Sequence, residues 1–148
     1  MIREYPDRPI VGIGVVVLAF NKVLMIRRSK PPRMGHWSLP GGAQELGETV
    51  FQAASREVKE ETGLDVEILG IIDVVDSIEP DDKGKVQYHY TLIDVVATVY
   101  GPDKPLAGGD AIEVAWKSPK EISDMDLWSE TKRIINLAIE MANLINNS

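Results

Sequence analysis

The chain lacks cysteine entirely, which excludes disulfide bonds and thiolate metal sites. A chain without cysteine is compatible with the reducing cytoplasm, and a cytoplasmic location is therefore expected. Long hydrophobic runs are also missing, since the longest candidate, residues 10–20, is interrupted by Gly12 and Gly14. The first residues lack the apolar stretch of a signal peptide. These absences argue against a membrane partner.

Basic residues are also few compared with acidic ones. The chain has 16 Lys and Arg against 23 Asp and Glu, which gives a formal net charge of −7. Binding to long nucleic acid normally depends on Lys and Arg that neutralise phosphates, so long nucleic acid is not an expected partner. A small-molecule nucleotide substrate is compatible with this charge, because a bound metal ion supplies positive charge locally. With 148 residues, 44% of them hydrophobic, the chain is expected to form a single domain over residues 1–148.

A helix with clear ends is predicted after residue 49. Thr49 and Gln52 fit a capping box at its start, and Gly63 stands where a left-handed C-terminal cap is expected. Apolar residues recur every four positions and predict its buried face, namely Val50, Ala54 and Val58.

Three glutamates of this helix point to metal chemistry. Glu57, Glu60 and Glu61 are spaced i, i+3 and i+4, which places them on one helix face. Three carboxylates on one face repel each other and weaken an isolated helix. A hard cation such as Mg²⁺ or Mn²⁺ converts this repulsion into ligation, because it prefers oxygen ligands.

The other segments alternate between strand-like and polar stretches. Strands are predicted over residues 10–20, 23–27, 66–75, 86–100 and 111–116, and loops over 29–36, 79–85 and 101–110. A short helix is predicted from Pro119 through Ile122, and a terminal helix over 129–143. The apolar stripe of the terminal helix comprises Ile134, Leu137, Ala138, Met141 and Leu144. The order strands, helix, strands, helix suits a mixed sheet between helices.

The segment from Gly42 to Leu64 matches the Nudix box, G-x5-E-x7-R-E-U-x-E-E-x-G-U with U aliphatic, at every defined position. The preceding residues 37–42, WSLPGG, also resemble the family's lead-in to the box. The chain therefore resembles Nudix hydrolases. This resemblance implies an α/β fold, an α/β/α sandwich with a mixed central sheet, and hydrolysis of a phosphoanhydride bond.

The resemblance also implies a set of site residues. Glu57, Glu60 and Glu61 are the expected metal ligands, together with the carbonyl of Gly41 before the box. Arg56 is expected to pair with Glu48 and to orient ligands, and Glu48 is a further candidate for a second metal.

The general base and the substrate contacts are open. Glu113 stands in an E-x-x-W stretch similar to one found in small nucleotide-sugar Nudix proteins, and is a candidate metal ligand or general base. Asp110 is the alternative candidate for the same roles. The candidate substrate contacts are Arg27, Arg28 or Arg33 for a phosphate, Asp110, and Tyr88, Tyr90 or Phe20 for stacking on a base.

The stretch from 88 to 116 is similar to small proteins grouped as ADP-ribose pyrophosphatases, which release AMP and ribose 5-phosphate from ADP-ribose. Two alternatives stay open: a nucleoside triphosphate pyrophosphohydrolase, which releases pyrophosphate, and a non-catalytic nucleotide sensor. Relatives commonly form homodimers, so a homodimer is an expected assembly. The N-terminal dimerisation region of larger ADP-ribose pyrophosphatases does not precede the first predicted strand here.

Overall fold

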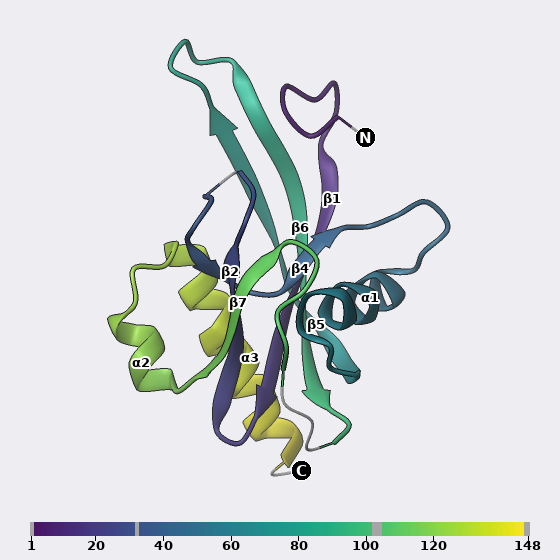
Figure 1. The fold of residues 1–148 in the computed structure, drawn as a ribbon, viewed down its shortest axis with the longest axis vertical. Helices are drawn as coiled ribbons and strands as arrows, with labels where there is room; N and C mark the ends of the chain where they lie inside the picture. The colour runs from purple at the N-terminus through teal and green to yellow at the C-terminus, as the bar shows by residue number, and fades with distance from the viewer. Residues whose placement is uncertain (1, 32, 102–104, 147–148) are drawn as a thin grey trace.

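The computed structural model describes residues 2–31, 33–101 and 105–146. A seven-stranded mixed sheet lies between helices, with α1 and α3 on opposite faces (Figure 1). The strands are β1 (Ile10–Ala19), β2 (Lys22–Arg28), β3 (Trp37–Ser38), β4 (Gly41–Ala43), β5 (Val66–Pro80), β6 (Val86–Val99) and β7 (Ala111–Lys117). The helices are α1 (Val50–Thr62), α2 (Pro119–Asp124) and α3 (Ser129–Asn146). The predicted α/β sandwich is confirmed.

Strand β1 is the centre of the sheet. It runs parallel to β6 and antiparallel to β4, and its last residues pair with β2. Strands β3 and β7 pair with β2, and β5 pairs with β6 to form the other edge. In this register Gly14 of β1 has Gly41 of β4 on one side and Asp94 of β6 on the other.

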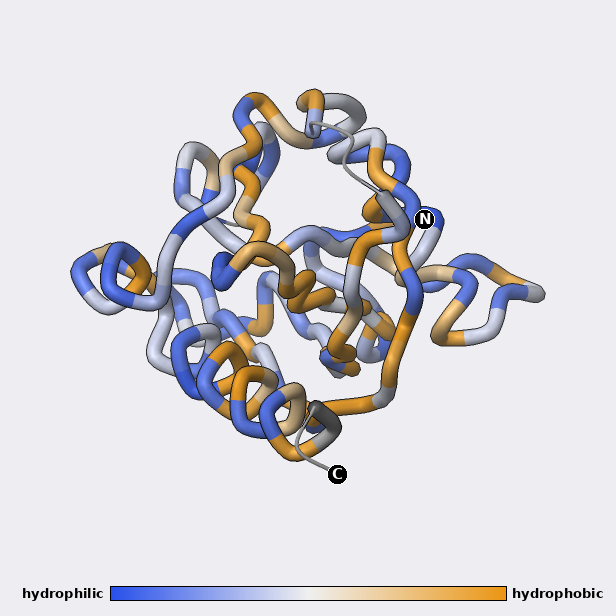
Figure 2. The backbone as a smooth tube through the Cα atoms, turned by 90° about the horizontal axis from the view of Figure 1, so that it is seen from below, coloured by the Kyte–Doolittle hydropathy of each residue, from blue (hydrophilic) through white to orange (hydrophobic). Residues whose placement is uncertain are grey.

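Two apolar cores lie on the two faces of the sheet. Odd-numbered residues of β1 and β6 face α1, whose Ala53, Ala54 and Val58 are fully buried against them. Even-numbered residues face α3, with Ile134, Ile135 and Ala138 as the buried helix residues. Figure 2 shows hydrophobic colour along the inner segments and both colours around the turns of the helix that ends near the C-terminus. The period of two in the strands thus builds both cores at once.

The helix and strand predictions are largely confirmed, with three differences. Strand β5 continues to Pro80, although residues 79–85 were expected to be a loop. Pairing of Glu79 with Tyr88 and of Pro80 with Val86 extends the hairpin beyond its apolar part, and Figure 1 shows β5 and β6 projecting past the rest of the sheet. The short strands β3 and β4 were not predicted, because a few residues carry no periodic pattern.

The third difference concerns the terminal helix. Leu144 is 72% exposed, whereas Ile135, which was not in the predicted stripe, is 1% exposed. Of the predicted loop over 101–110, residues 102–104 lie outside the described residues. None of the helices in the described ranges is long and apolar enough to cross a membrane.

Candidate active site

Helix α1 begins and ends as its sequence predicts. The amide of Gln52 donates to Thr49 Oγ1 over 3.1 Å, and the amide of Thr49 donates to Gln52 Oε1 over 2.9 Å. Gly63 has a left-handed φ of 75°, and its amide donates to the Lys59 carbonyl over 2.9 Å. These caps fix the length and rotation of the helix, and with them the direction of its glutamates.

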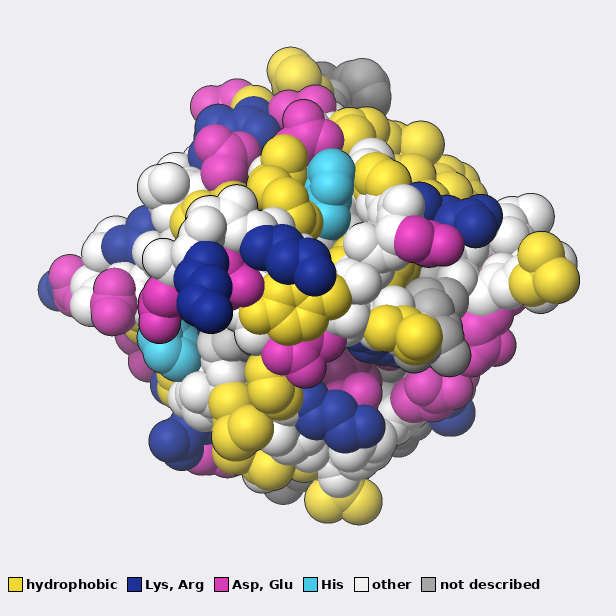
Figure 3. Space-filling model, turned by 90° about the horizontal axis from the view of Figure 1, so that it is seen from above, with side chains coloured by type: hydrophobic (Ala, Val, Ile, Leu, Met, Phe, Trp, Pro, Cys, Tyr) yellow, Lys and Arg dark blue, Asp and Glu magenta, His cyan; other side chains and the backbone are white. Residues whose placement is uncertain are grey.

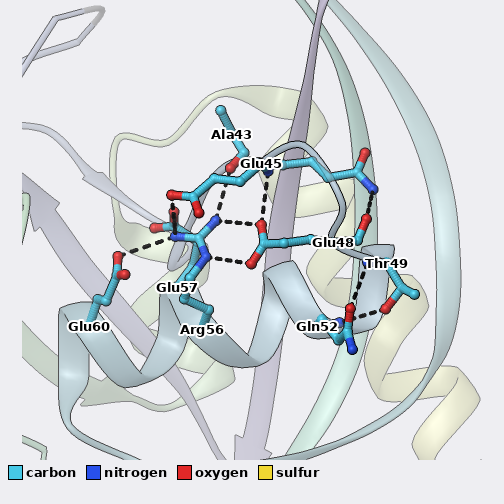
Figure 4. Close-up of polar contacts among 9 residues, drawn as sticks. Ala43, Glu45, Glu48, Thr49, Gln52, Arg56, Glu57 and Glu60 are labelled. Carbon is cyan, nitrogen blue, oxygen red and sulfur yellow. Dashed lines mark hydrogen bonds and ion pairs between the residues drawn. The ribbon is translucent and has the colours of Figure 1, made fainter. Parts of the chain in front are cut away.

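Arg56 joins Glu48, Glu57 and Glu60 of the box into one cluster (Figure 4). Its Nε and Nη2 bind Glu48 over 2.6 and 2.9 Å, and its Nη1 binds Glu57 over 2.7 Å and Glu60 over 3.3 Å. Nη2 also donates to the Ala43 carbonyl over 3.1 Å. The hydrogen bonds from Arg56 lower the pKa of Glu48, and the carboxylates raise the pKa of Arg56. The expected pairing of Arg56 with Glu48 is therefore observed.

Glu61 is the most buried of the three helix glutamates. Its Oε1 accepts a hydrogen bond from the amide of Gly41 over 2.7 Å. Burial raises the pKa of the Glu61 carboxyl to about 8, and the charge of Glu57 adds to this rise. Burial also raises the pKa of Glu57, although Arg56 opposes it. An added Cβ on Gly42 would lie 2.6 Å from the Glu57 carboxyl, so glycine at this position leaves room for the carboxyl as it lies in the structure.

Both carboxylates border a cavity of about 340 Å³. Its floor includes Gly12 and Gly14 of β1, and its walls come from β2, β3, β4, β6 and the start of α3. The lining residues beside the glutamates include Arg28, Lys30 and Asp110. The cavity therefore brings cationic and anionic side chains together over a floor formed by the backbone of two glycines.

The donor set suits a hard divalent cation. Glu57, Glu61 and Gly41 line one cavity and offer oxygen ligands. The charge of Glu60 raises the pKa of Glu57 and the charge of Glu57 raises the pKa of Glu61, a repulsion that a cation offsets. Within the described residues, no group of three or more Asp, Glu or His side chains is already gathered closely enough to hold a metal ion. Glu60 is not among the lining residues; its side chain is 53% exposed and contacts Arg56.

The loop before β7 is fastened to the C-terminal end of α1. The amides of Leu106 and Gly108 donate to the carbonyls of Thr62 and Glu61 over 2.8 and 3.1 Å. Asp110 follows this attachment, and its carboxylate pairs with Lys30 over 3.0 Å. The loop thereby holds Asp110 at the cavity next to the end of α1.

The structure separates the remaining candidates. Arg28 lines the cavity, whereas Arg27 bonds to Glu113 over 2.9 Å and to the Gly35 carbonyl, and neither Arg27 nor Glu113 is a lining residue.

Among the aromatic candidates, Tyr90 lines the cavity and Tyr88 does not. Arg33 also lines it, while Phe20 packs edge-on against Trp116 at a centroid distance of 5.8 Å, away from the lining. Asp110, Arg28 and Tyr90 are therefore better placed than Glu113, Arg27 and Tyr88.

Several lining residues were missed from the sequence. Asp94 on β6 is 5% exposed and lies in the cavity floor, and residues 126–128 before α3 form part of the wall. Arg33 lies 4.6 Å from the ring centroid of Trp128 and binds Glu79 over 2.8 Å. The sequence does single out Asp94, because it is the one acidic residue in the strand stretch 86–99.

Three comparisons identify the relatives of this chain. It matches the family model described as the NUDIX domain over residues 8–138. It is 39% identical over 88 residues to an ADP-ribose pyrophosphatase of Methanocaldococcus jannaschii, covering 60% of this chain and 52% of that protein. It is 35% identical over 116 residues to a MutT-like protein of Streptomyces ambofaciens, covering 75% of this chain and 64% of that protein. The chain thus spans about half to two thirds of these relatives.

A solved structure agrees with these matches. The MutT NUDIX hydrolase from Burkholderia pseudomallei has a TM-score of 0.71 and 25% identity, covering 88% of this chain and 98% of that one. The family match includes the Arg56 cluster, the capped helix and the glycines of β4. This chain therefore belongs to the Nudix family.

Proposed function

We propose that this enzyme hydrolyses the phosphoanhydride bond of a nucleoside diphosphate linked to another group, such as ADP-ribose, with Mg²⁺ or Mn²⁺ as cofactor. The products from ADP-ribose would be AMP and ribose 5-phosphate. The observation that carries the proposal is the meeting of Glu57, Glu61, Arg28 and Lys30 at one cavity. The name of the archaeal relative, ADP-ribose pyrophosphatase, supports this choice of substrate.

The carboxylates of Glu57, Glu60 and Glu61 and the Gly41 carbonyl would hold the cation. When bound, the cation supplies positive charge to the phosphate oxygens and lowers the pKa of a water ligand. Glu60 takes part after a rotation away from Arg56, which it contacts over 3.3 Å. Arg56 keeps Glu48 and Glu57 in position, a role that supports the ligands without touching the substrate.

The cationic residues of the cavity would bind the diphosphate. Arg28 and Lys30 offer charge-assisted hydrogen bonds to phosphate oxygens. Asp110 would accept the proton of the attacking water, because it lines the cavity and Glu113 does not. Acidic side chains are interspersed with the basic ones on the face seen in Figure 3, which suits a small substrate better than long nucleic acid.

The size of the cavity favours a second candidate function. About 340 Å³ is near the lower end of ligand-site volumes, which run from roughly 300 to 1,000 Å³. A single nucleoside triphosphate fits a site of this size, so release of pyrophosphate from a triphosphate is the second candidate.

The test is turnover of a substrate panel with Mg²⁺ and then Mn²⁺, with the products separated and identified. The panel contains ADP-ribose, dinucleoside polyphosphates, nucleotide sugars and nucleoside triphosphates. Formation of AMP and ribose 5-phosphate supports the proposal, and formation of a monophosphate and pyrophosphate selects the second candidate. Metal-dependent binding without turnover would point to a nucleotide sensor and contradict both.

The Glu57→Gln variant tests the site itself. We expect turnover to fall by at least about 100-fold, because a cation ligand is lost while the side-chain volume is kept. Glu67→Gln is the matched control, since Glu67 is an exposed glutamate on β5. Equal turnover in the two variants would exclude Glu57 as a ligand.

A further inference from the structure

Asp94 is a buried carboxyl that the proposed chemistry does not use. It lies in the middle of β6, 5% exposed, next to the fully buried Val95 and Val96. Within residues 2–31, 33–101 and 105–146, no group donates a hydrogen bond to its side chain and no cationic nitrogen lies within 4.0 Å of it. Burial raises the pKa of Asp94 to about 6, with a smaller rise from the charge of Asp73. No side-chain oxygen or nitrogen of the described residues is both sealed from solvent and without a partner, so the Asp94 carboxyl must reach the open space of the cavity, where an occupant can contact it.

The side chain of Asp94 opens into the cavity. Asp94 is a lining residue, and it lies over Gly14 of the neighbouring strand. A Cβ placed on Gly14 would run into Asp94 Oδ1, so glycine at this position makes room for the carboxyl. Gly12, two residues earlier, likewise makes room for Leu92. Asp94 is therefore an acceptor aimed at whatever occupies the floor of the cavity.

The sheet register places Asp94 two strands away from Gly41, the residue that contacts Glu61. Gly14 has Asp94 on one side and Gly41 on the other, and the Gly41 amide holds Glu61. Adjacent strands are about 4.8 Å apart, so the Asp94 and Gly41 backbones are roughly 10 Å apart. In a nucleotide the sugar is the group next to the phosphates. If the phosphates lie at the glutamates, the nucleoside ribose is the part of the substrate that would reach Asp94.

The residues beyond Asp94 suit a nucleobase. Leu92 and Tyr90 follow on the same face of β6, and Trp128 comes from the segment before α3; all three line the cavity. Aromatic and apolar side chains offer stacking surface to a base. With the phosphates at the glutamates and the base at this wall, the ribose lies between them.

We propose that Asp94 is a specificity-determining residue that accepts hydrogen bonds from the vicinal 2′- and 3′-hydroxyls of the substrate's nucleoside ribose. The two oxygens of one carboxylate match the two donors of a cis-diol, and an acidic side chain on ribose hydroxyls is a recurrent solution in nucleotide sites. The inference rests on the proposed function, because it takes the phosphates to lie at Glu57 and Glu61. It predicts an enzyme that selects ribonucleotide over deoxyribonucleotide substrates.

The test compares ADP-ribose with analogues that lack the 2′- or the 3′-hydroxyl of the adenosine ribose. In the wild-type enzyme we expect kcat/KM to fall by roughly 10- to 100-fold for each analogue, because a buried acceptor loses its donor. In Asp94→Asn the ribose form should lose activity while the deoxy forms change little. The preference for ribose should then shrink to about threefold or less.

Asp73→Asn is the matched control. Asp73 faces Asp94 across the β5–β6 pair, binds Arg133 over 2.9 Å and is not a lining residue. This variant should keep the wild-type preference for ribose. Gly14→Ala, whose Cβ would displace the Asp94 carboxyl, should lose it as Asp94→Asn does.

Three results would overturn the inference. The first is a wild-type enzyme that cuts ribose and deoxy forms equally well. The second is an Asp94→Asn variant that loses the same factor on both, as a purely structural role would give. The third is a change in the preference between adenine and guanine substrates with the deoxy effect intact, which would assign Asp94 to the base.

Equilibrium binding separates this inference from the proposed function. AMP and 2′,3′-dideoxy-AMP are titrated by calorimetry against the wild type and Asp94→Asn. If the enzyme hydrolyses none of the panel, the proposed function fails. A wild-type preference for AMP that disappears in Asp94→Asn would still support ribose recognition, and no preference would refute it.

Discussion

Arg56 shows how one side chain can organise a site. Its guanidinium binds Glu48 through two nitrogens, reaches Glu57 and Glu60 through the third, and holds the Ala43 carbonyl. A guanidinium offers this planar fork of donors, whereas the lysine ammonium is a single point charge. Arg56 thereby ties the loop before α1 to the helix and offsets the repulsion among the glutamates.

Replacing Arg56 by lysine keeps the charge and removes the fork. We expect Arg56→Lys to lower the free energy of unfolding by about 1–3 kcal/mol, because partly buried acceptors lose their donors. Turnover should also fall by roughly 10-fold or more. Denaturant unfolding and steady-state kinetics measure both. Arg133→Lys is the control, an exposed arginine bonded to Glu130 and Asp73, and should cost less than about 1 kcal/mol. Similar losses in the two variants would contradict the special role of Arg56.

Asp110 and Glu113 make a second residue-scale comparison. Asp110 lines the cavity, whereas Glu113 is bonded to Arg27 outside it. If Asp110 is the proton acceptor, Asp110→Asn should lower kcat by roughly 100-fold or more, and Glu113→Gln by about threefold or less. Kinetics on the two purified variants decide the assignment. The reverse order would return the base to Glu113.

At the scale of elements, the contact between α1 and the loop before β7 positions one side of the cavity. The last carbonyls of α1 lack helix partners, and the amides of Leu106 and Gly108 satisfy two of them. The loop can approach this closely because Gly108 has no side chain: an added Cβ would lie 2.7 Å from the Glu60 carbonyl. The position of Asp110 therefore depends on a helix end far away in the sequence.

Gly108→Ala tests this contact. The added methyl should push the loop off the helix end, lower stability by about 1–3 kcal/mol and reduce kcat/KM by roughly 10-fold through displacement of Asp110. Unfolding curves and kinetics are the measurements. Gly101→Ala is the control, because nothing lies within 4 Å of the Cβ it would add. A Gly108→Ala variant with wild-type kinetics would show that the loop adapts without moving Asp110.

At the scale of the whole molecule, the buried Asp94 links stability to pH. Its pKa is raised from 3.8 to about 6, mainly by burial, so the folded state binds its proton more tightly than the unfolded state. Stability therefore falls as the pH rises between these two values. The charged groups that act on Asp94 are Asp73 on β5 and Arg133 and Glu130 on α3. The ionised carboxyl costs on the order of 3 kcal/mol near neutral pH.

Asp94→Asn removes this cost. We expect the variant to be more stable than the wild type by about 2 kcal/mol near pH 7, with the advantage disappearing toward about pH 4. Denaturant unfolding of both proteins across this pH range gives the difference directly. Asp73→Asn, whose carboxyl is half-exposed and bonded to Arg133, should not show this pattern. An Asp94→Asn advantage that is the same at all pH values would mean that the charge is not its cause.

The sequence predicted those features that depend on neighbours close along the chain. The caps of α1 and the shared face of its glutamates arise within residues 49–63, where the periodicity of a helix fixes geometry. The pairing of Arg56 with Glu48, which lies before the helix, was expected from the resemblance to the Nudix box. The many β-branched and aromatic residues in 10–20 and 86–100 likewise predicted strands. The extension of β5 to Pro80 was missed, because that part of the strand is held by pairing with β6 and not by its own apolar pattern.

Only the tertiary structure decided which residues share the cavity. Arg27 and Arg28 are adjacent in sequence and both basic, yet pairing of β2 with β7 directs Arg27 to Glu113 and leaves Arg28 at the cavity. The position of Asp94 above Gly14 depends on the parallel pairing of two strands far apart in the chain. By itself the sequence determined the acidic helix and the family, because those rest on local spacing. The floor, walls and candidate ribose site came from strand register, which is set by contacts between distant residues.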